Sequence, residues 1–567
     1  MSTIAEVIAY LQDEVPRRAA AHAVPGVAIG LCDRDDILWA EGFGTTRGHS
    51  DGNDQPMRSG PGRPIGIDTM FSVQSTSKLY TATGVLAAVQ DGLVDLDVPI
   101  LQYLPDFTVG SDFEDHPERR ITLRHLLTHT AGFTHDAPIG SNYEVSDATF
   151  EEHLASIQQT YLRFPVGHHH EYSNLGIDVA GQVVVAASGQ RFAEFMRGRL
   201  FEPLGLVRST FDFLAYDADD DAAFGHSRAF ASSGRPLPRR VPMVPSGGLY
   251  ASVGDVLRYL QFQLRGGEEV VAPQVLRQHL EFPKVAVEQT RGYGLGLYVD
   301  RWEPGVEVLH HGGAGFGFLC QVFWSPEVGI GGAILTNALD HDIQNELAAD
   351  IVRMLADGRA ARPVPGFSRT ASSKATSVAA ASAEAILGQY VGRLSDVVRI
   401  AVRDGRLVRV SVTEELLDLD DELTATVDDP AGGPPTRLVF LRDSAGHVRY
   451  LLEPVSGDVR YRTWVPELPP ASLASSVLGD YVSRQCGVPM SRYRLRQDGT
   501  HPAIEFVSCD ASDNQIVLQL TSVGGNRYLS ATGEVLTITD AGLSYGGIPL
   551  TRPDTHPSAS PARQNES

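Results

Sequence analysis

Basic side chains are scarce in this sequence of 567 residues, which carries 47 Lys and Arg against 70 Asp and Glu and a formal net charge of −23. A protein that binds nucleic acid neutralises phosphates with a basic face. The acidic balance therefore argues against a general nucleic-acid-binding protein, and we expect no nucleic-acid partner. An acidic excess of this kind is typical of a solvated surface.

Cysteines and long apolar runs are also few. Four cysteines without a CxxC pair argue against a disulfide scaffold. No stretch approaches the roughly 18 uncharged apolar residues of a membrane span. Near the amino end, Ile4, Val7, Ile8 and Leu11 follow a helical period and do not form the continuous apolar run of a secretory signal. The sequence predicts a packed N-terminal helix, a cytoplasmic location and no membrane partner.

The pattern of the chain changes along its length. With 42% hydrophobic and 21% charged residues, the composition is that of a globular protein, and the length suggests several domains. Helical and strand patterns alternate through residues 1–358, which we expect to form one large domain. Residues 359–384 are rich in Ala, Ser, Thr and Pro, as in a linker. Short alternating strand patterns predict two small β domains at 385–470 and 476–552, and the tail at 553–567 is expected to be disordered.

Two local features characterise the predicted β domains. Asp404-Gly405 lies between two arms of alternating apolar residues and predicts a tight hairpin, because both residue types tolerate positive φ. The sequence Leu-Gly-Gln-Tyr-Val at 387–391 recurs as Leu-Gly-Asp-Tyr-Val at 478–482. This echo favours a duplicated β unit, although five residues can also coincide by chance.

A serine and a lysine are placed three residues apart at a predicted helix start. The segment 71–78 reads Phe-Ser-Val-Gln-Ser-Thr-Ser-Lys and precedes a helical pattern that Gly92 can end. Residues i and i+3 share a helix face, so Ser75 Oγ and the Lys78 amine can meet. The amine can help the hydroxyl to lose its proton, and the N–H groups of the helix start favour developing negative charge. SxxK is common by chance, so this motif alone does not identify a nucleophile.

Two later segments strengthen the case for a catalytic site. The first is Tyr172-Ser173-Asn174, in which a nearby ammonium would make the Tyr172 phenolate accessible as a general base. Asn174 can hold the lysine or a substrate amide. The second is the glycine-rich stretch 310–318, in which glycines let a substrate lie against a strand edge and His311 can steady charge or relay a proton.

In this order, the three segments resemble the serine hydrolases of the class C β-lactamase, D-aminopeptidase and family VIII esterase group, the S12 peptidase family. The match rests on SxxK at 75–78, YxN at 172–174 and HxG at 311–313, and it covers about residues 20–355. Supporting phrases lie at 121–132, 246–250, 293–296 and 335–337. The resemblance implies an α+β fold like that of penicillin-binding proteins, an antiparallel sheet with helices plus a helical region. Two small antiparallel β-barrel-like domains are expected to follow it, as in the D-aminopeptidase branch.

The resemblance also implies roles for single residues. Ser75 would be acylated, and Lys78 and Tyr172 would share the general-base and general-acid work. Asn174 would orient Lys78 and bind substrate.

The glycine-rich strand would complete the site. Backbone N–H groups of Ser75 and Ala314 would form the oxyanion hole, beside the substrate-binding Gly312 and Gly313. His311 stands where β-lactamases have the lysine of their KTG box, and a neutral imidazole recognises a substrate carboxylate less well. β-Lactamase activity is therefore not the expected main function.

Other motifs have ordinary explanations. Two GxSxG strings, at 48–52 and 542–546, lack the strand before and helix after that a nucleophile elbow needs. Three adjacent histidines at 168–170 rarely point to one ion, so we expect surface or pocket-rim histidines, no metal and no cofactor.

The sequence thus favours a metal-independent serine hydrolase that cleaves a small peptide, amide or ester through an acyl-enzyme on Ser75, plausibly one with D-configured residues. An acyl transferase that ligates or cyclises peptides would use the same residues. A catalytically silent peptide-binding protein is the alternative of a different class. The C-terminal region is expected to cover the cleft, to mediate a homodimer, or to be a passive appendage.

Overall fold

A computed structural model describes most of the chain. The described residues are 3–47, 62–111, 113–135, 137, 139–140, 148–162, 164–168, 170–227, 240–267, 270–280, 292–302, 305–339, 341–356, 380–391, 397–410, 414–421, 423–427, 436–443, 445–455, 458–465, 472–485, 488–498, 501–507, 515–524, 526–530, 535–539, 542–545 and 548–552. The predicted tail, residues 359–379 of the predicted linker and the GxSxG string at 48–52 lie outside them. Within the described part, no helix has the length and apolarity needed to cross a bilayer.

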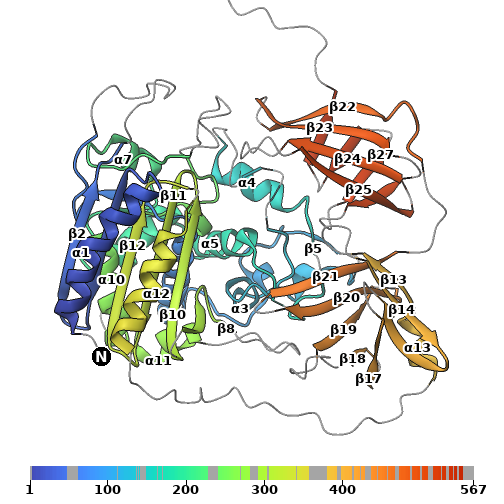
Figure 1. The fold of residues 1–567 in the computed structure, drawn as a ribbon, viewed down its shortest axis with the longest axis horizontal. Coiled ribbons are helices and arrows are strands. Elements are labelled where there is room, and N and C mark those ends of the chain that lie inside the picture. Colours follow the sequence, from blue (N-terminus) through green and yellow to red (C-terminus); the bar gives the residue numbers. More distant parts are fainter. Residues whose placement is uncertain are drawn as a thin grey trace, which may run out of the picture.

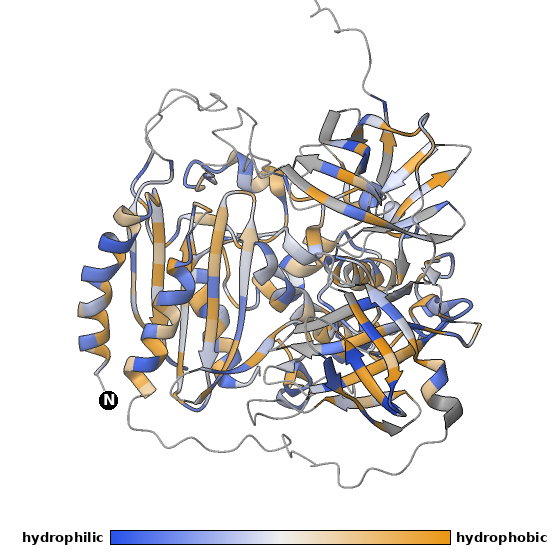
Figure 2. Ribbon diagram, turned by 45° about the vertical axis from the view of Figure 1, so that its right-hand side comes forward, coloured by the Kyte–Doolittle hydropathy of each residue, from blue (hydrophilic) through white to orange (hydrophobic). Residues whose placement is uncertain are grey.

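The large N-terminal part of the chain, from α1 to α12, is built on a seven-stranded antiparallel sheet (Figure 1). Its strands, in spatial order, are β2 (Ile37–Gly44), β1 (Gly26–Cys32), β12 (Ile330–Thr336), β11 (Phe318–Ser325), β10 (Val306–Gly315), β9 (Tyr298–Trp302) and β8 (Gly292–Tyr293). Strand β1 is buried along its whole length. Figure 2 shows hydrophobic residues in orange along the strands of the sheet. The apolar run at 27–31 is therefore an inner strand of the sheet.

Helices cover both faces of this sheet. On one face lie α1 (Ile4–Ala21) and α12 (Ile343–Ala356), which bury an apolar cluster that includes Val7, Leu11 and Leu347. Alternate residues of β1 contribute to opposite faces, because successive strand side chains point to opposite sides. The N-terminal helix and its apolar stripe are confirmed, with Val7 and Leu11 fully buried.

The second face carries α10 (Val253–Arg265) and the helical region. The other helices of this part are α2 (Ser77–Gln90), α3 (Leu123–Leu127), α4 (Phe150–Ile157), α5 (Asn174–Ser188), α6 (Phe192–Met196), α7 (Phe213–Ala218), α9 (Val244–Gly247) and α11 (Pro273–Leu276). Short strand pairings accompany them: β3 (Met70–Ser72), β7 (Tyr250–Ser252) and β6 (Ser209–Thr210) in one sheet, and the parallel pair β4 (Gly110–Ser111) and β5 (Tyr161–Leu162). The helical region between Ser75 and Tyr172 thus also holds a small parallel strand pair.

A nine-stranded antiparallel sheet follows the short helix α13 (Ala380–Ala385), which occupies the end of the predicted linker. Its strands, in spatial order, are β16 (Glu414–Leu416), β15 (Arg406–Val410), β14 (Val397–Arg403), β13 (Gly388–Val391), β21 (Asp458–Val465), β20 (Val448–Val455), β19 (Thr436–Arg442), β18 (Thr424–Val427) and β17 (Asp418–Asp421). Leu417 alone separates the two edge strands β16 and β17, so the sheet must curl until its edges approach each other. The predicted hairpin is confirmed: Asp404 and Gly405 have φ of +50° and +75° between β14 and β15.

The C-terminal strands close into an eight-stranded barrel, shown in red in Figure 1. They are β22 (Gly479–Gln485), β23 (Val488–Asp498), β24 (His501–Val507), β25 (Gln515–Gly524), β26 (Arg527–Ser530), β27 (Val535–Thr539), β28 (Gly542–Tyr545) and β29 (Ile548–Thr551). Ser544, from the second GxSxG string, lies in β28 and pairs with residues of two neighbouring strands, so it has no elbow geometry.

The echoed five-residue sequences adopt the same local structure. Each begins the first strand of its β unit, and each tyrosine hydroxyl donates to the carbonyl four residues earlier, Tyr390 to Ile386 at 2.9 Å and Tyr481 to Val477 at 2.7 Å. Their glycines, Gly388 and Gly479, have φ of +137° and +125°. The same turn, strand start and hydrogen bond in both units support a duplicated β element.

The nine-stranded sheet packs against the large N-terminal part of the chain. Phe113 and Phe164 of the helical region share a buried apolar cluster with residues of β19 and β20. The rings of Phe113 and Tyr450 lie 4.2 Å apart between centroids. This contact attaches the first β unit to the chain segment that leads to Tyr172.

Candidate active site

Ser75 lies in a short 3₁₀ turn, η1 (Gln74–Thr76), immediately before α2. Gln74, which precedes it, has a φ of +49°, a conformation that non-glycine residues adopt rarely and mostly where the surrounding structure imposes it. The turn is fastened to β10 because Thr76 Oγ1 donates to the His311 carbonyl at 3.2 Å. Ser75 itself is half-buried, whereas Gln74 and Thr76 on either side are buried.

Lys78 is fully buried in the first turn of α2, and its amine is surrounded by oxygen atoms. Its Nζ lies 3.1 Å from Ser75 Oγ, 2.8 Å from Asn174 Oδ1 and 2.8 Å from the Ser246 carbonyl oxygen. Asn174 is the first residue of α5, and Ser246 lies in α9. Three helices therefore meet at this one nitrogen.

Tyr172 approaches the same group from the segment before α5. Lys78 Nζ lies 4.9 Å from the centre of its ring. Burial and the neighbouring Tyr298 phenol raise the pKa of Tyr172 well above its usual value, against an opposing effect of the Ser75 hydroxyl. Burial thus acts against the phenolate that the sequence predicts as a general base.

His311 lies in the adjacent strand β10 and is bonded to a tyrosine. Its Nδ1 faces the Gly312 carbonyl at 2.6 Å and therefore carries the hydrogen, while Nε2 accepts from the Tyr293 hydroxyl at 3.1 Å. Burial, together with the nearby charge of Lys78, lowers the pKa of His311 to about 3. The imidazole is thus neutral around pH 7, and its ring centre is 6.1 Å from that of Tyr172.

Gly312, Gly313 and Ala314 continue the strand beside the Ser75 turn. A Cβ on Gly313 would overlap the Val73 carbonyl oxygen, so only glycine allows this approach of strand to turn. Ala314 is exposed and pairs with Leu319 of β11. The strand therefore offers an accessible edge next to Ser75.

Sequence reasoning did not single out a cluster of rings around Tyr172. The His129 ring centre lies 4.5 Å from that of Tyr172 and 4.6 Å from that of Tyr293. His129 Nδ1 accepts from the Ser173 N–H at 3.3 Å, and burial lowers the pKa of His129 well below its usual value. His129 and Tyr293 lie in the family-like segments 121–132 and 293–296. These segments were the only hint in the sequence analysis that the two residues belong to the site.

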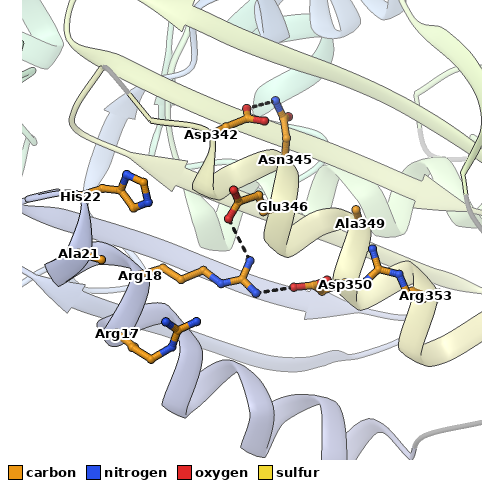
Figure 3. Close-up of a pocket in the computed structure, with 10 residues that line it drawn as sticks. All are labelled: Arg17, Arg18, Ala21, His22, Asp342, Asn345, Glu346, Ala349, Asp350 and Arg353. Carbon is orange, nitrogen blue, oxygen red and sulfur yellow. Dashed lines mark hydrogen bonds and ion pairs between the residues drawn. The ribbon is translucent and has the colours of Figure 1, made fainter.

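A surface hollow of about 700 Å³ lies between α1 and α12 and serves a structural purpose (Figure 3). Arg18 of α1 donates to Asp350 at 2.6 Å and to Glu346 at 3.2 Å on α12. These ion pairs join α1 to α12 on this face of the sheet.

Comparisons with known proteins agree with this fold. A family model for β-lactamases matches residues 11–353, more than half of the chain. The D-alanyl-D-alanine-carboxypeptidase/endopeptidase AmpH of Escherichia coli K12 is 25% identical over 333 residues, which are 55% of this chain and 84% of that protein. Esterase EstB of Burkholderia gladioli is 30% identical over 276 residues, 42% of this chain and 67% of the esterase.

A solved structure extends the likeness beyond the catalytic part. The octameric penicillin-binding protein homologue from Pyrococcus abyssi matches with a TM-score of 0.52 and 21% identity, over 80% of this chain and 99% of the homologue. At this identity the match speaks for the fold alone. Together with the family match, it identifies the chain as a member of the β-lactamase family of serine hydrolases, with the fold of penicillin-binding proteins.

Proposed function

We propose that this protein hydrolyses peptide, amide or ester bonds through an acyl-enzyme on Ser75. The observation that carries the proposal is the position of Lys78 Nζ, 3.1 Å from Ser75 Oγ and 2.8 Å from each of two other oxygens. A serine hydroxyl needs a neighbouring base before it attacks a carbonyl group. A buried amine in contact with that hydroxyl is such a base.

The partners of Lys78 explain how it can take a proton. The Asn174 Oδ1 and Ser246 carbonyl oxygens accept hydrogen bonds only, so each requires an N–H from the amine. A free amine has two N–H groups for them and directs its lone pair to Ser75. An ammonium fills the same three directions with three N–H groups. Lys78 can therefore accept and return the Ser75 proton without moving.

In acylation, Ser75 Oγ forms a bond to the substrate carbonyl carbon while its proton passes to Lys78 Nζ. The carbonyl π electrons move to the carbonyl oxygen, which becomes an oxyanion. The backbone N–H groups of Ser75 and Ala314 donate hydrogen bonds to it. One such donor typically lowers the barrier by about 3 to 4 kcal/mol. The carbonyl then re-forms, the bond to the leaving nitrogen or oxygen breaks, and the leaving group takes up a proton.

Tyr172 is the proposed proton donor to the leaving group. A raised pKa keeps its phenol protonated, and its ring lies 4.9 Å from Lys78 Nζ, the atom that contacts Ser75 Oγ. The phenol gives its proton to the leaving atom and recovers one from the Lys78 ammonium. In deacylation, water attacks the acyl carbon and its proton passes to the Tyr172–Lys78 pair. The bond between that carbon and Ser75 Oγ then breaks, Ser75 Oγ takes up the proton, and the carboxylic acid leaves.

The neutral His311 favours substrates without a carboxylate at this strand. A group whose pKa is lowered to about 3 supplies no cation at neutral pH for the carboxylate of a β-lactam or of a peptide C-terminus. This supports aminopeptidase-like or esterase chemistry, with D-configured residues as the first substrates to try. The relatives include an esterase and a carboxypeptidase/endopeptidase, which fits the bond types proposed.

The test is covalent labelling and turnover in matched serine variants. Wild-type protein is expected to react with a fluorophosphonate probe and to hydrolyse p-nitrophenyl esters, and Ser75→Ala should lose both activities. Ser544→Ala, which changes the serine of the second GxSxG string, should keep both. Turnover in Ser75→Ala would overturn the nucleophile assignment. A panel of D- and L-aminoacyl amides, esters and nitrocefin would then define the acyl group.

A further inference from the structure

A carboxylate lies fully buried behind the site, on the same helix as Asn174. Asp178 is 0% exposed and its two oxygens receive three hydrogen bonds. Ser246 supplies two of them, from its backbone N–H to Oδ1 at 2.9 Å and from its hydroxyl to Oδ2 at 3.0 Å. A buried charge is costly unless it is paired and hydrogen-bonded, so this arrangement compensates Asp178.

His153 of α4 supplies the third contact. Its Nε2 lies 3.0 Å from Asp178 Oδ2, its Nδ1 faces the Ile139 carbonyl oxygen, and its side chain is also 0% exposed. The Ile139 carbonyl oxygen can only accept, so His153 Nδ1 carries a hydrogen. The contact between Nε2 and Asp178 Oδ2 is then a hydrogen bond only when a further proton lies between these two atoms. The pair is therefore a buried, hydrogen-bonded unit.

Ser246 connects this unit to the reacting groups. Its N–H and its hydroxyl are both held by one carboxylate, and this fixes the orientation of its peptide. Its carbonyl then points the other way and accepts from Lys78 Nζ at 2.8 Å. The next residue toward the amino end, Pro245, is held as well, since Thr81 Oγ1 of α2 donates to its carbonyl at 2.6 Å.

Helix α5 thus reaches Lys78 by two routes. Asn174 at its first turn contacts the amine directly, and Asp178, one turn later, contacts it through Ser246. The charge of Asp178 is also felt at Tyr172, where it acts to favour the neutral phenol. One buried carboxylate, that of Asp178, therefore acts on both proposed proton carriers: on Lys78 through Ser246 and on Tyr172 through its charge.

We propose that Asp178, held by His153, is a positioning residue that fixes the Ser246 carbonyl and through it the amine of Lys78. This inference rests on the proposed function, because it assigns the support of the same site. Side chains in an active site need such supporting contacts, since a misplacement of about 1 Å can lower a rate by 10²-fold. A merely structural ion pair would affect stability without this selective effect on the chemical step.

The experiment measures inactivation by a fluorophosphonate, which separates reagent affinity (KI) from the maximal covalent rate (kinact). Asp178→Asn keeps the shape but removes the charge, and we expect kinact to fall at least 10-fold with KI within threefold of wild type. The control is Leu347→Ala, a fully buried change in α12 far from Ser75, chosen for a comparable loss of Tm. It should leave kinact within twofold of wild type.

A milder pair of variants keeps the test decisive if Asp178→Asn does not fold. Ser246→Ala removes one of the two clamping bonds, and Thr83→Ala removes a buried hydroxyl of α2 that bonds to Tyr259 instead. We expect a decrease in kinact of about threefold for Ser246→Ala only. Equal kinact in the two variants, or a change in KI alone, would overturn the positioning role. Absence of labelling in the wild type, or labelling of Ser75→Ala, would instead overturn the proposed function.

Discussion

Asn174 reaches from the first turn of α5 to Lys78 on α2, with 2.8 Å between Asn174 Oδ1 and Lys78 Nζ. An amide oxygen at this distance accepts a hydrogen bond but does not by itself fix the charge of the amine. Replacing this amide with a carboxylate changes the charge beside Lys78 and keeps the shape of the side chain.

Asn174→Asp should slow acylation and move the acidic limb of the kcat/KM profile to higher pH. A carboxylate beside Lys78 favours its charged form, so a higher pH is needed to obtain the free amine. We expect a loss of about 10²-fold in kcat/KM at pH 7, in the range seen for general-base changes. Asn345→Asp, an exposed change on α12, is the control and should keep the wild-type profile. An unchanged profile in Asn174→Asp would contradict Lys78 as the base.

Tyr172→Phe should discriminate between leaving groups. An amide nitrogen must be protonated as it leaves, whereas p-nitrophenolate is a stable anion. Loss of a general acid typically costs about 10²- to 10⁴-fold, so hydrolysis of anilides or amides should fall in that range and p-nitrophenyl esters should lose much less. Tyr103→Phe, which removes a hydroxyl bonded to the Asp95 backbone, is the control. Equal losses for both substrate classes would argue against Tyr172 as the acid.

Gly313→Ala should disable the site although it adds a single methyl group. The added Cβ would overlap the Val73 carbonyl, a backbone atom that cannot move without shifting the Ser75 turn. We expect kcat to fall more than about 10²-fold, because a displaced nucleophile loses its alignment. Gly198→Ala, where a Cβ would meet nothing within 4 Å, should behave as wild type.

Stability should fall as the pH decreases from 6.5 to 5. Burial lowers the pKa of His311 to about 3 and that of His279 to about 4, so both stay neutral in the folded protein over this range. In the unfolded chain they bind protons below pH 6.5, and stability therefore rises with pH and is lost on acidification. Each such histidine contributes about 2 kcal/mol of this loss at pH 5. Calorimetric Tm values at both pH values check it, and His279→Asn should reduce the difference between them.

Contact between the first β unit and the catalytic part should contribute to stability. The Tyr450 ring packs on Phe113 at 4.2 Å between centroids. Tyr450→Ser should destabilise the catalytic part by about 2 to 4 kcal/mol, as for other large-to-small changes of buried rings. Thermal unfolding with limited proteolysis would detect the earlier loss of that part. Tyr545→Ser, inside the C-terminal barrel, should affect the barrel alone.

Local features of the fold could be predicted because they depend on neighbouring residues. The strand at 27–31 follows from its apolar run, and the hairpin at Asp404-Gly405 follows from the tolerance of both residues for positive φ. The repeated tyrosines of the two β units were visible in the same way. The barrel-like shape of the first unit was expected from the resemblance, but the order of its strands was not, because that order depends on which distant segments pair.

The site was predictable only as far as motifs extend. Ser75, Lys78, Tyr172 and Asn174 lie in recognisable motifs, and the structure brings these four together. Burial is not visible in a motif, so its effect on the pKa of Tyr172 could not be predicted. His153 belongs to none of the motifs, and its place beside Asp178 depends on how α4 packs on α5.

Lys78 joins α2, α5 and α9 at one atom, and this has an evolutionary consequence. A change of Lys78 to an apolar residue would leave the Asn174 and Ser246 oxygens buried without their donor, so it would penalise folding as well as turnover. Ser75 is half-buried, and its replacement would not take the donor away from these two buried oxygens. If a descendant of this protein kept binding but lost catalysis, we expect Ser75 to be replaced before Lys78, because Lys78 is also needed for folding.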